Sequence, residues 1–126
     1  MTKEEQMFEK QEFRSLCIER ENVHPEAYWE YHRIWKLLLD IILKDKRSFH
    51  EFIEYMKTEM TESEYSTLSE ISDEIAYEYP SFAFIDAYKM LAEKYPEETK
   101  KYHIAGFIKD AEASVRCSMN EGRTMY

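Results

Sequence analysis

Turn-forming residues are nearly absent from this chain, which has only two Gly and three Pro in 126 residues. An all-β fold needs many tight turns, and such turns depend on Gly and Pro. Hydrophobic residues make up 44% of the chain, which is enough for a core without disulfides or metals. The sequence therefore predicts an all-α fold, and its length predicts a single domain over residues 1–126.

Capping patterns and apolar periodicity predict six helical segments. The first follows a capping box formed by Thr2 and Glu5, and the second is expected over residues 25–43. Because the second segment is apolar nearly all round, we expect it at the centre of the bundle. Its core stripe is predicted to consist of Tyr28, His32, Trp35, Leu39 and Ile42.

The remaining segments have recognisable starts and ends. The third and fourth are predicted to begin at capping boxes, Ser48 with Glu51 and Thr61 with Glu64. Pro80 ends the fourth segment, Ser81 can cap the fifth, and Pro96 opens the sixth. Their core stripes include Phe52, Leu68, Tyr88 and Ile108, and residues 120–126 are expected to fray. The predicted fold is a compact bundle of five to six helices.

Negative charge is concentrated in one part of the chain. The net charge is −9, and residues 58–88 contain eight acidic residues and no Lys, Arg or His, which leaves −1 for the remainder. The acids of this segment are either a solvated helix face or a docking surface that steers a cationic partner. An acidic protein repels nucleic-acid phosphates and anionic membranes, so neither is expected as a direct partner.

Helical geometry separates two tyrosines of the acidic segment. At about 100° per residue, Ile71, Ile75 and Tyr79 fall on the side of Leu68, whereas Tyr77 falls opposite them among acids. An exposed Tyr surrounded by carboxylates would supply the aromatic anchor that interfaces favour. We call the predicted partner-binding residues the acidic face: Glu62, Glu70, Asp73, Glu74, Tyr77 and Glu78.

A short stretch of the acidic segment is similar to a known motif. Its residues are Ser72, Asp73, Ile75, Tyr77, Tyr79 and Pro80. They resemble the Ser-Asp-Leu-Ile-Tyr-Tyr-Pro stretch in the immunity proteins of DNase colicins, although this chain has additional residues between Asp73 and Pro80. The match covers under a tenth of the chain. The resemblance implies a small helical inhibitor that neutralises a basic nuclease through acids and tyrosines.

These observations predict a non-catalytic protein that needs no cofactor and binds a basic protein, most concretely an immunity or inhibitor protein for a toxin or nuclease. One alternative is a small metal-binding protein or enzyme. His50 and Glu51 begin a zincin-like His-Glu-x-x-His pattern in which Glu54 replaces the second His. His32 is expected either as a core imidazole or as a ligand inside the bundle. A DNA-mimicking regulator is the other alternative.

The sequence also carries expectations about compartment. Its first residues lack the basic and apolar regions of a signal peptide, which favours a cytoplasmic location. The most apolar run, residues 35–43, contains Lys36 and Asp40 and is too short to span a bilayer. Cys17 and Cys117 match no metal or redox motif and are expected as reduced thiols, with a bridge between the terminal helices as the alternative.

Overall fold

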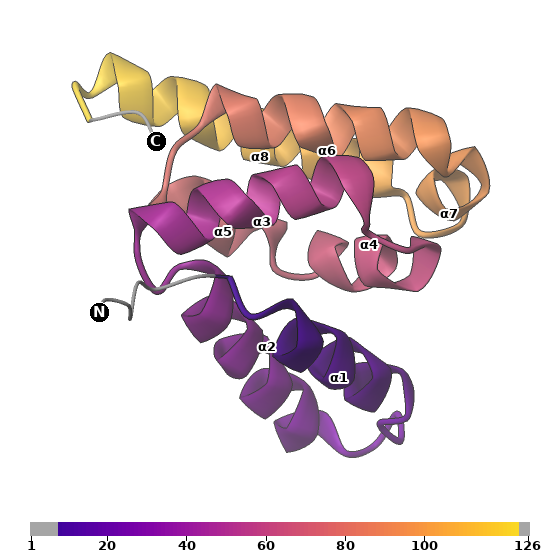
Figure 1. The fold of residues 1–126 in the computed structure, drawn as a ribbon. Helices are drawn as coiled ribbons and strands as arrows, with labels where there is room; N and C mark the ends of the chain where they lie inside the picture. Colours follow the sequence, from indigo (N-terminus) through magenta and orange to yellow (C-terminus); the bar gives the residue numbers. More distant parts are fainter. Residues whose placement is uncertain (1–7, 124–126) are drawn as a thin grey trace. The chain divides into compact units, whose positions relative to one another are not determined.

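The computed structural model describes residues 8–123, and within this range the chain is helical and contains no β-strand (Figure 1). The all-α prediction is confirmed. Eight helices are present in the described range, so the predicted count of five to six is wrong. The helices are α1 (Lys10–Glu21), α2 (Tyr28–Ile42), α3 (Lys46–Thr58), α4 (Glu62–Ser69), α5 (Ser72–Glu78), α6 (Phe82–Lys94), α7 (Pro96–Lys101) and α8 (Ile104–Asn120).

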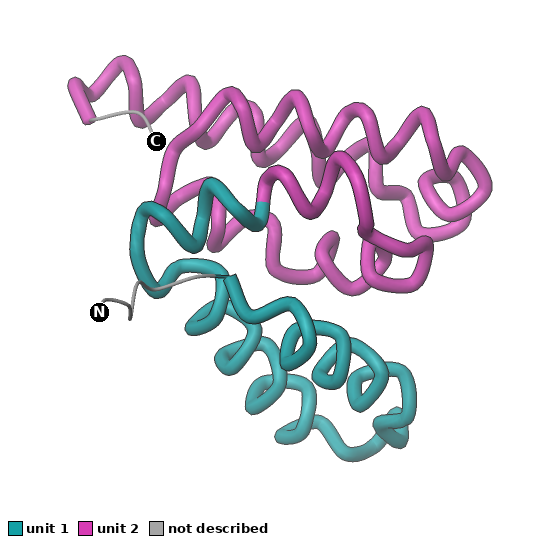
Figure 2. Tube along the Cα trace, in the orientation of Figure 1, with its two compact units in different colours: residues 1–52 teal, residues 53–126 magenta. Residues whose placement is uncertain are grey.

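The chain forms two compact units, Met1–Phe52 and Ile53–Tyr126, with the boundary inside α3 (Figure 2). In the first unit α1 and α2 lie against each other. Phe8, Phe13 and Phe52 form an aromatic cluster in which each pair of ring centroids is 5.2–5.5 Å apart. No helix in the described part of the chain is long and apolar enough to cross a membrane.

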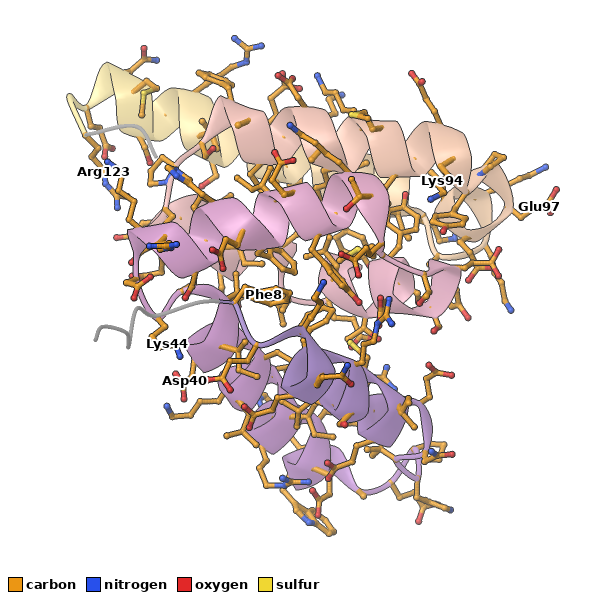
Figure 3. The ribbon with its side chains drawn as sticks, viewed as in Figure 1. Phe8, Asp40, Lys44, Lys94, Glu97 and Arg123 are labelled. Carbon is orange, nitrogen blue, oxygen red and sulfur yellow. The ribbon has the colours of Figure 1, made fainter. Side chains whose placement is uncertain are left out.

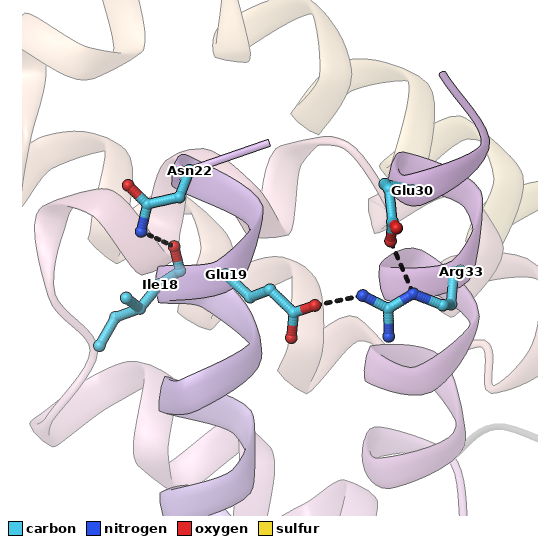
Figure 4. Close-up of polar contacts among 5 residues, drawn as sticks. All are labelled: Ile18, Glu19, Asn22, Glu30 and Arg33. Carbon is cyan, nitrogen blue, oxygen red and sulfur yellow. Dashed lines mark hydrogen bonds and ion pairs between the residues drawn. The ribbon is translucent and has the colours of Figure 1, made fainter. Parts of the chain in front are cut away.

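Polar contacts join the two helices of the α1–α2 hairpin (Figure 4). The Arg33 guanidinium of α2 forms an ion pair with Glu19 of α1 and donates to Glu30 over 2.7 Å. At the end of α1, the Asn22 amide donates to the Ile18 carbonyl over 3.0 Å. These contacts are exposed, so we expect them to fix the hairpin's geometry more than its stability.

The buried face of α2 differs from the predicted one by about one residue, or 100° of rotation. Its buried residues are Ile34, Leu38, Ile41 and Ile42. Tyr28 and Trp29 are each 67% exposed, and His32 is also exposed, so the predictions of a central helix and a core His32 are wrong. Branched aliphatic side chains occupy the core here, while the aromatic residues lie along the rim, where their polar atoms can reach water.

In the second unit α8 lies against α4, α5, α6 and α7. It contributes Ile104, Ile108, Ala111 and Val115, at steps of four and three residues, to the core as predicted. Aromatic residues of α4 and α6 pack there too, with the rings of Tyr65 and Tyr88 6.2 Å apart. The helix at the centre of this unit is therefore α8.

The predicted fourth helix is divided into α4 and α5. Glu70 and Ile71 donate their N–H groups to carbonyls three residues back, and Ile71 leaves the helical region with φ −122° and ψ 8°. The Ser69 hydroxyl donates to the Ser66 carbonyl over 2.6 Å, and Ser72 donates to Ser69 over 3.3 Å. Serine hydroxyls that bond nearby carbonyls compete with the helical ladder, which gives a physical reason for the break.

The predicted sixth helix is also divided. His103 adopts a left-handed conformation with φ 56° and separates α7 from α8. The end of α8 is closed by a Schellman motif rather than frayed: Gly122 has φ 82°, and the N–H groups of Gly122 and Arg123 bond the Met119 and Ser118 carbonyls. Residues 124–126 lie outside the described range.

The predicted caps have three different outcomes. Thr61 and Glu64 form a full capping box, and Ser81 accepts from the Phe84 N–H over 3.2 Å, so both predictions are confirmed. Ser48 does not cap α3; instead the Asp45 carboxylate accepts from the Ser48 N–H over 2.8 Å. The box predicted at residues 2–5 lies outside the described residues.

Candidate functional site

Four of the six predicted partner-binding residues lie together on α5. The buried residues of this helix are Ser72, Ile75 and Ala76, and α5 lies against α8. The exposed residues occupy the intervening positions of the helical repeat: Asp73, Glu74, Tyr77 and Glu78. One short helix therefore presents three carboxylates and a phenol on the side away from the core.

Tyr77 is 60% exposed, which confirms the predicted contrast with its neighbours. Tyr79, predicted as core, is only half-buried. The Arg123 guanidinium lies over the Tyr77 ring, with its central carbon 4.9 Å from the ring centroid. Arg123 was absent from the predicted site, because nothing in the local sequence indicates that the end of α8 returns to α5.

Asp73 has a second acidic residue near it that the sequence did not indicate. Partial desolvation, followed by the negative charge of Asp110 on α8, raises the pKa of the Asp73 carboxyl. The side chains of Asp73, Glu74 and Glu78 form no hydrogen bond or ion pair with any residue in the range 8–123. The α5 carboxylates thus have no ion-pair partner within this range.

Glu62 and Glu70 belong to a different part of the chain. Glu62 is exposed in the first turn of α4, and Glu70 is half-buried at the C-terminal cap of the same helix. The break at Ile71 separates both residues from α5, so the acidic face is not one continuous helix surface. Its compact part is the group on α5.

Two basic residues of α6 and α8, Lys89 and Arg116, form ion pairs with the same acidic residue. Glu112 on α8 accepts from Lys89 over 3.1 Å and from Arg116 over 3.0 Å, and these bonds lower the pKa of the Glu112 carboxyl. The guanidinium of Arg116 also lies 5.7 Å from the centroid of the Phe82 ring. Lys89 and Arg116 are therefore paired with Glu112 and not with the α5 carboxylates.

Other candidates do not converge on a site. Glu51 accepts from the Phe8 N–H over 2.8 Å and from Arg47 over 3.4 Å, and Glu54 pairs with Lys57 over 3.3 Å. The described residues contain no group of three or more His, Cys, Asp or Glu side chains placed to hold a metal ion. Both cysteines are free; Cys17 is buried and Cys117 is exposed.

Comparisons of this chain with protein-family models, with curated proteins and with solved structures found no match. Function is therefore inferred from the geometry and charge of α5 and the side chains around it.

Proposed function

We propose that this protein binds a basic partner protein through α5, and that it has no catalytic role in doing so. The observation that supports this most strongly is the exposed group of Asp73, Glu74, Tyr77 and Glu78, whose carboxylates are unpaired within residues 8–123. A cationic surface would gain ion pairs with them and would bury the Tyr77 ring at the centre of the contact.

The concrete form of the proposal is an immunity or inhibitor protein that covers the cationic active site of a toxin or nuclease. In this mechanism the carboxylates occupy the positions that substrate phosphates would take in the basic groove. The resemblance of residues 72–80 to the immunity proteins of DNase colicins supports this form. Long-range attraction would speed association and would weaken as salt is added, since the Debye length is about 8 Å at physiological ionic strength.

The test is capture of basic proteins from a cell lysate at low and moderate salt. We expect the wild type to capture a basic protein that a triple variant, Asp73→Lys, Glu74→Lys and Tyr77→Ala, does not capture. Sequencing the captured protein and assaying its toxic or nuclease activity with and without this chain tests the inhibitor form directly.

The chain offers a matched control in its first unit. Tyr28 is 67% exposed, and Glu21 and Glu26 near it are exposed acids. The variant Glu21→Lys, Glu26→Lys and Tyr28→Ala makes the same change in charge and removes a tyrosine of similar exposure. It should capture the partner as the wild type does. Equal loss from both variants, or no loss from either, would contradict docking through α5.

A further inference from the structure

The chain already places one cationic group of its own on the proposed docking face. Arg123 follows the Schellman turn at the end of α8 (Figure 3), and its guanidinium lies over the Tyr77 ring at 4.9 Å. The turn fixes its backbone through the bond from the Arg123 N–H to the Ser118 carbonyl over 3.0 Å. The guanidinium also donates to the Ser118 hydroxyl over 3.3 Å. Backbone and side-chain contacts thus hold the cation at this ring.

The geometry favours a guanidinium over an ammonium. A guanidinium is planar and weakly hydrated, so it stacks on an aromatic face while its N–H groups remain able to bond carboxylates. Around Tyr77 the available acceptors are Asp73, Glu74 and Glu78, which are on the same exposed side of α5. An ammonium would gain the charge attraction but not the stacking and the paired hydrogen bonds.

We propose that Tyr77 is an arginine-binding position of the docking face, and that Arg123 occupies it until an arginine of the partner takes its place. This inference rests on the proposed function. It adds that the partner contacts Tyr77 through an arginine and that Arg123 of this chain competes for the same position. Arg123 covers one face of the ring in the free protein, while the Tyr77 side chain as a whole remains 60% exposed. A partner arginine that stacks on this face must displace Arg123, so its apparent affinity is reduced in proportion to the fraction of molecules in which the face is free. Partners that present lysine alone gain less from displacing it.

The experiment measures binding of hexa-arginine and hexa-lysine peptides by calorimetry to the full chain. Arg123→Gln should bind hexa-arginine more tightly than the wild type by roughly two- to fivefold, the range expected for an exposed cation–π contact. Because this substitution also removes a positive charge, the control is Lys109→Gln, which removes an exposed cation from α8. The increase in peptide affinity caused by Arg123→Gln must exceed the increase caused by Lys109→Gln. It must also be larger for hexa-arginine than for hexa-lysine.

A double-mutant cycle isolates the contact with the ring. In a Tyr77→Leu background, Arg123→Gln should change the affinity for hexa-arginine no more than Lys109→Gln does. In the wild type, hexa-arginine should shift the NMR resonance of the Arg123 side chain toward its position in Tyr77→Leu, because the ring current is lost.

Two results would overturn the inference in distinguishable ways. If Asp73→Lys with Glu74→Lys weakens peptide binding but Arg123→Gln matches Lys109→Gln, docking on α5 stands and the competing role of Arg123 is wrong. If the charge reversals leave peptide binding unchanged, the proposed docking face itself fails, and the inference fails with it.

Discussion

The Tyr55 hydroxyl bonds a buried carboxylate in the second unit, and its removal should cost measurable stability. Tyr55 and Glu64 are 3% and 4% exposed. The Tyr55 hydroxyl donates to Glu64 Oε1 over 2.7 Å, and the same oxygen accepts from the Thr61 N–H over 3.0 Å. This oxygen therefore links α3 to the capping box of α4.

The substitution Tyr55→Phe removes the hydroxyl and keeps the ring, so it creates almost no cavity. A hydrogen bond to a charged group contributes about 1.5–3 kcal/mol to stability. The Thr61 N–H continues to bond Glu64, which prevents the larger penalty of an unpaired buried charge. We therefore expect Tyr55→Phe to lower the free energy of unfolding by about 1.5–3 kcal/mol.

The assay is urea unfolding followed by far-ultraviolet circular dichroism, with a lower midpoint and an unchanged m-value expected. Trp29 and Trp35 both belong to the first unit, so tryptophan fluorescence reports that unit separately. The control is Tyr102→Phe, since Tyr102 is 42% exposed and such surface changes usually stay within about 0.5 kcal/mol. A loss in Tyr55→Phe no larger than in this control would refute the reasoning.

Three further predictions concern pH and the end of α8. Partial desolvation and then Asp110 raise the pKa of Asp73 above its unfolded value of 3.8, so the stability contributed by its protonated carboxyl is full below that pH and is lost as the pH rises. Thermal melts of Asp73→Asn should therefore show a melting temperature above that of the wild type at pH 7, by a margin that shrinks toward pH 3.8. Burial raises the pKa of Tyr88 above its unfolded value of 10.0, so the stability that its neutral phenol contributes is full below pH 10.0 and decreases as the pH rises above it. An alkaline titration should show this phenol ionising only as helicity falls, and ionisation with helicity retained would contradict this. Gly122→Ala meets no atom within 4 Å but keeps a φ of 82°, so it should cost about 1–2 kcal/mol and speed amide exchange at Arg123. Unchanged exchange would argue against the Schellman motif as the contact that fixes Arg123.

Local patterns predicted much of the core correctly. Phe52, Leu68, Tyr88 and Ile108 are buried as their periodicity indicated, because an amphipathic helix must bury its apolar stripe. The predicted phase of α2 is wrong, because apolar periodicity alone does not distinguish aromatic residues such as Tyr28, which is exposed, from the aliphatic residues that fill the buried face.

The helix breaks at Ile71 and His103 could not be found from turn-forming residues. Neither break contains Gly or Pro. Each depends on non-helical backbone angles at Ile71 or His103, residue types that do not ordinarily indicate a turn. The spacing of Ser66, Ser69 and Ser72 is the one local feature that could have indicated the first break, because the Ser69 and Ser72 hydroxyls bond carbonyls three residues back.

For the candidate site, the sequence predicted the exposure of Tyr77 and of the α5 carboxylates from helical phase alone. It could not predict Arg123 or Asp110, since both reach α5 only through the packing of α8 in the second unit. Contacts between residues far apart in the chain carry no periodic pattern. Glu62 and Glu70 lie apart from the group on α5, because the single helix that the periodicity predicts is broken at Ile71.

The most direct test of docking through α5 is NMR mapping of the chain with the captured basic protein. We expect the largest backbone shift changes at residues 72–78 and at residues 118–123, where Arg123 contacts Tyr77. Added salt should reduce these changes in proportion to the loss of binding. Changes centred on α1 and α2, around the exposed Tyr28 and Trp29, would contradict the proposal and assign binding to the other unit.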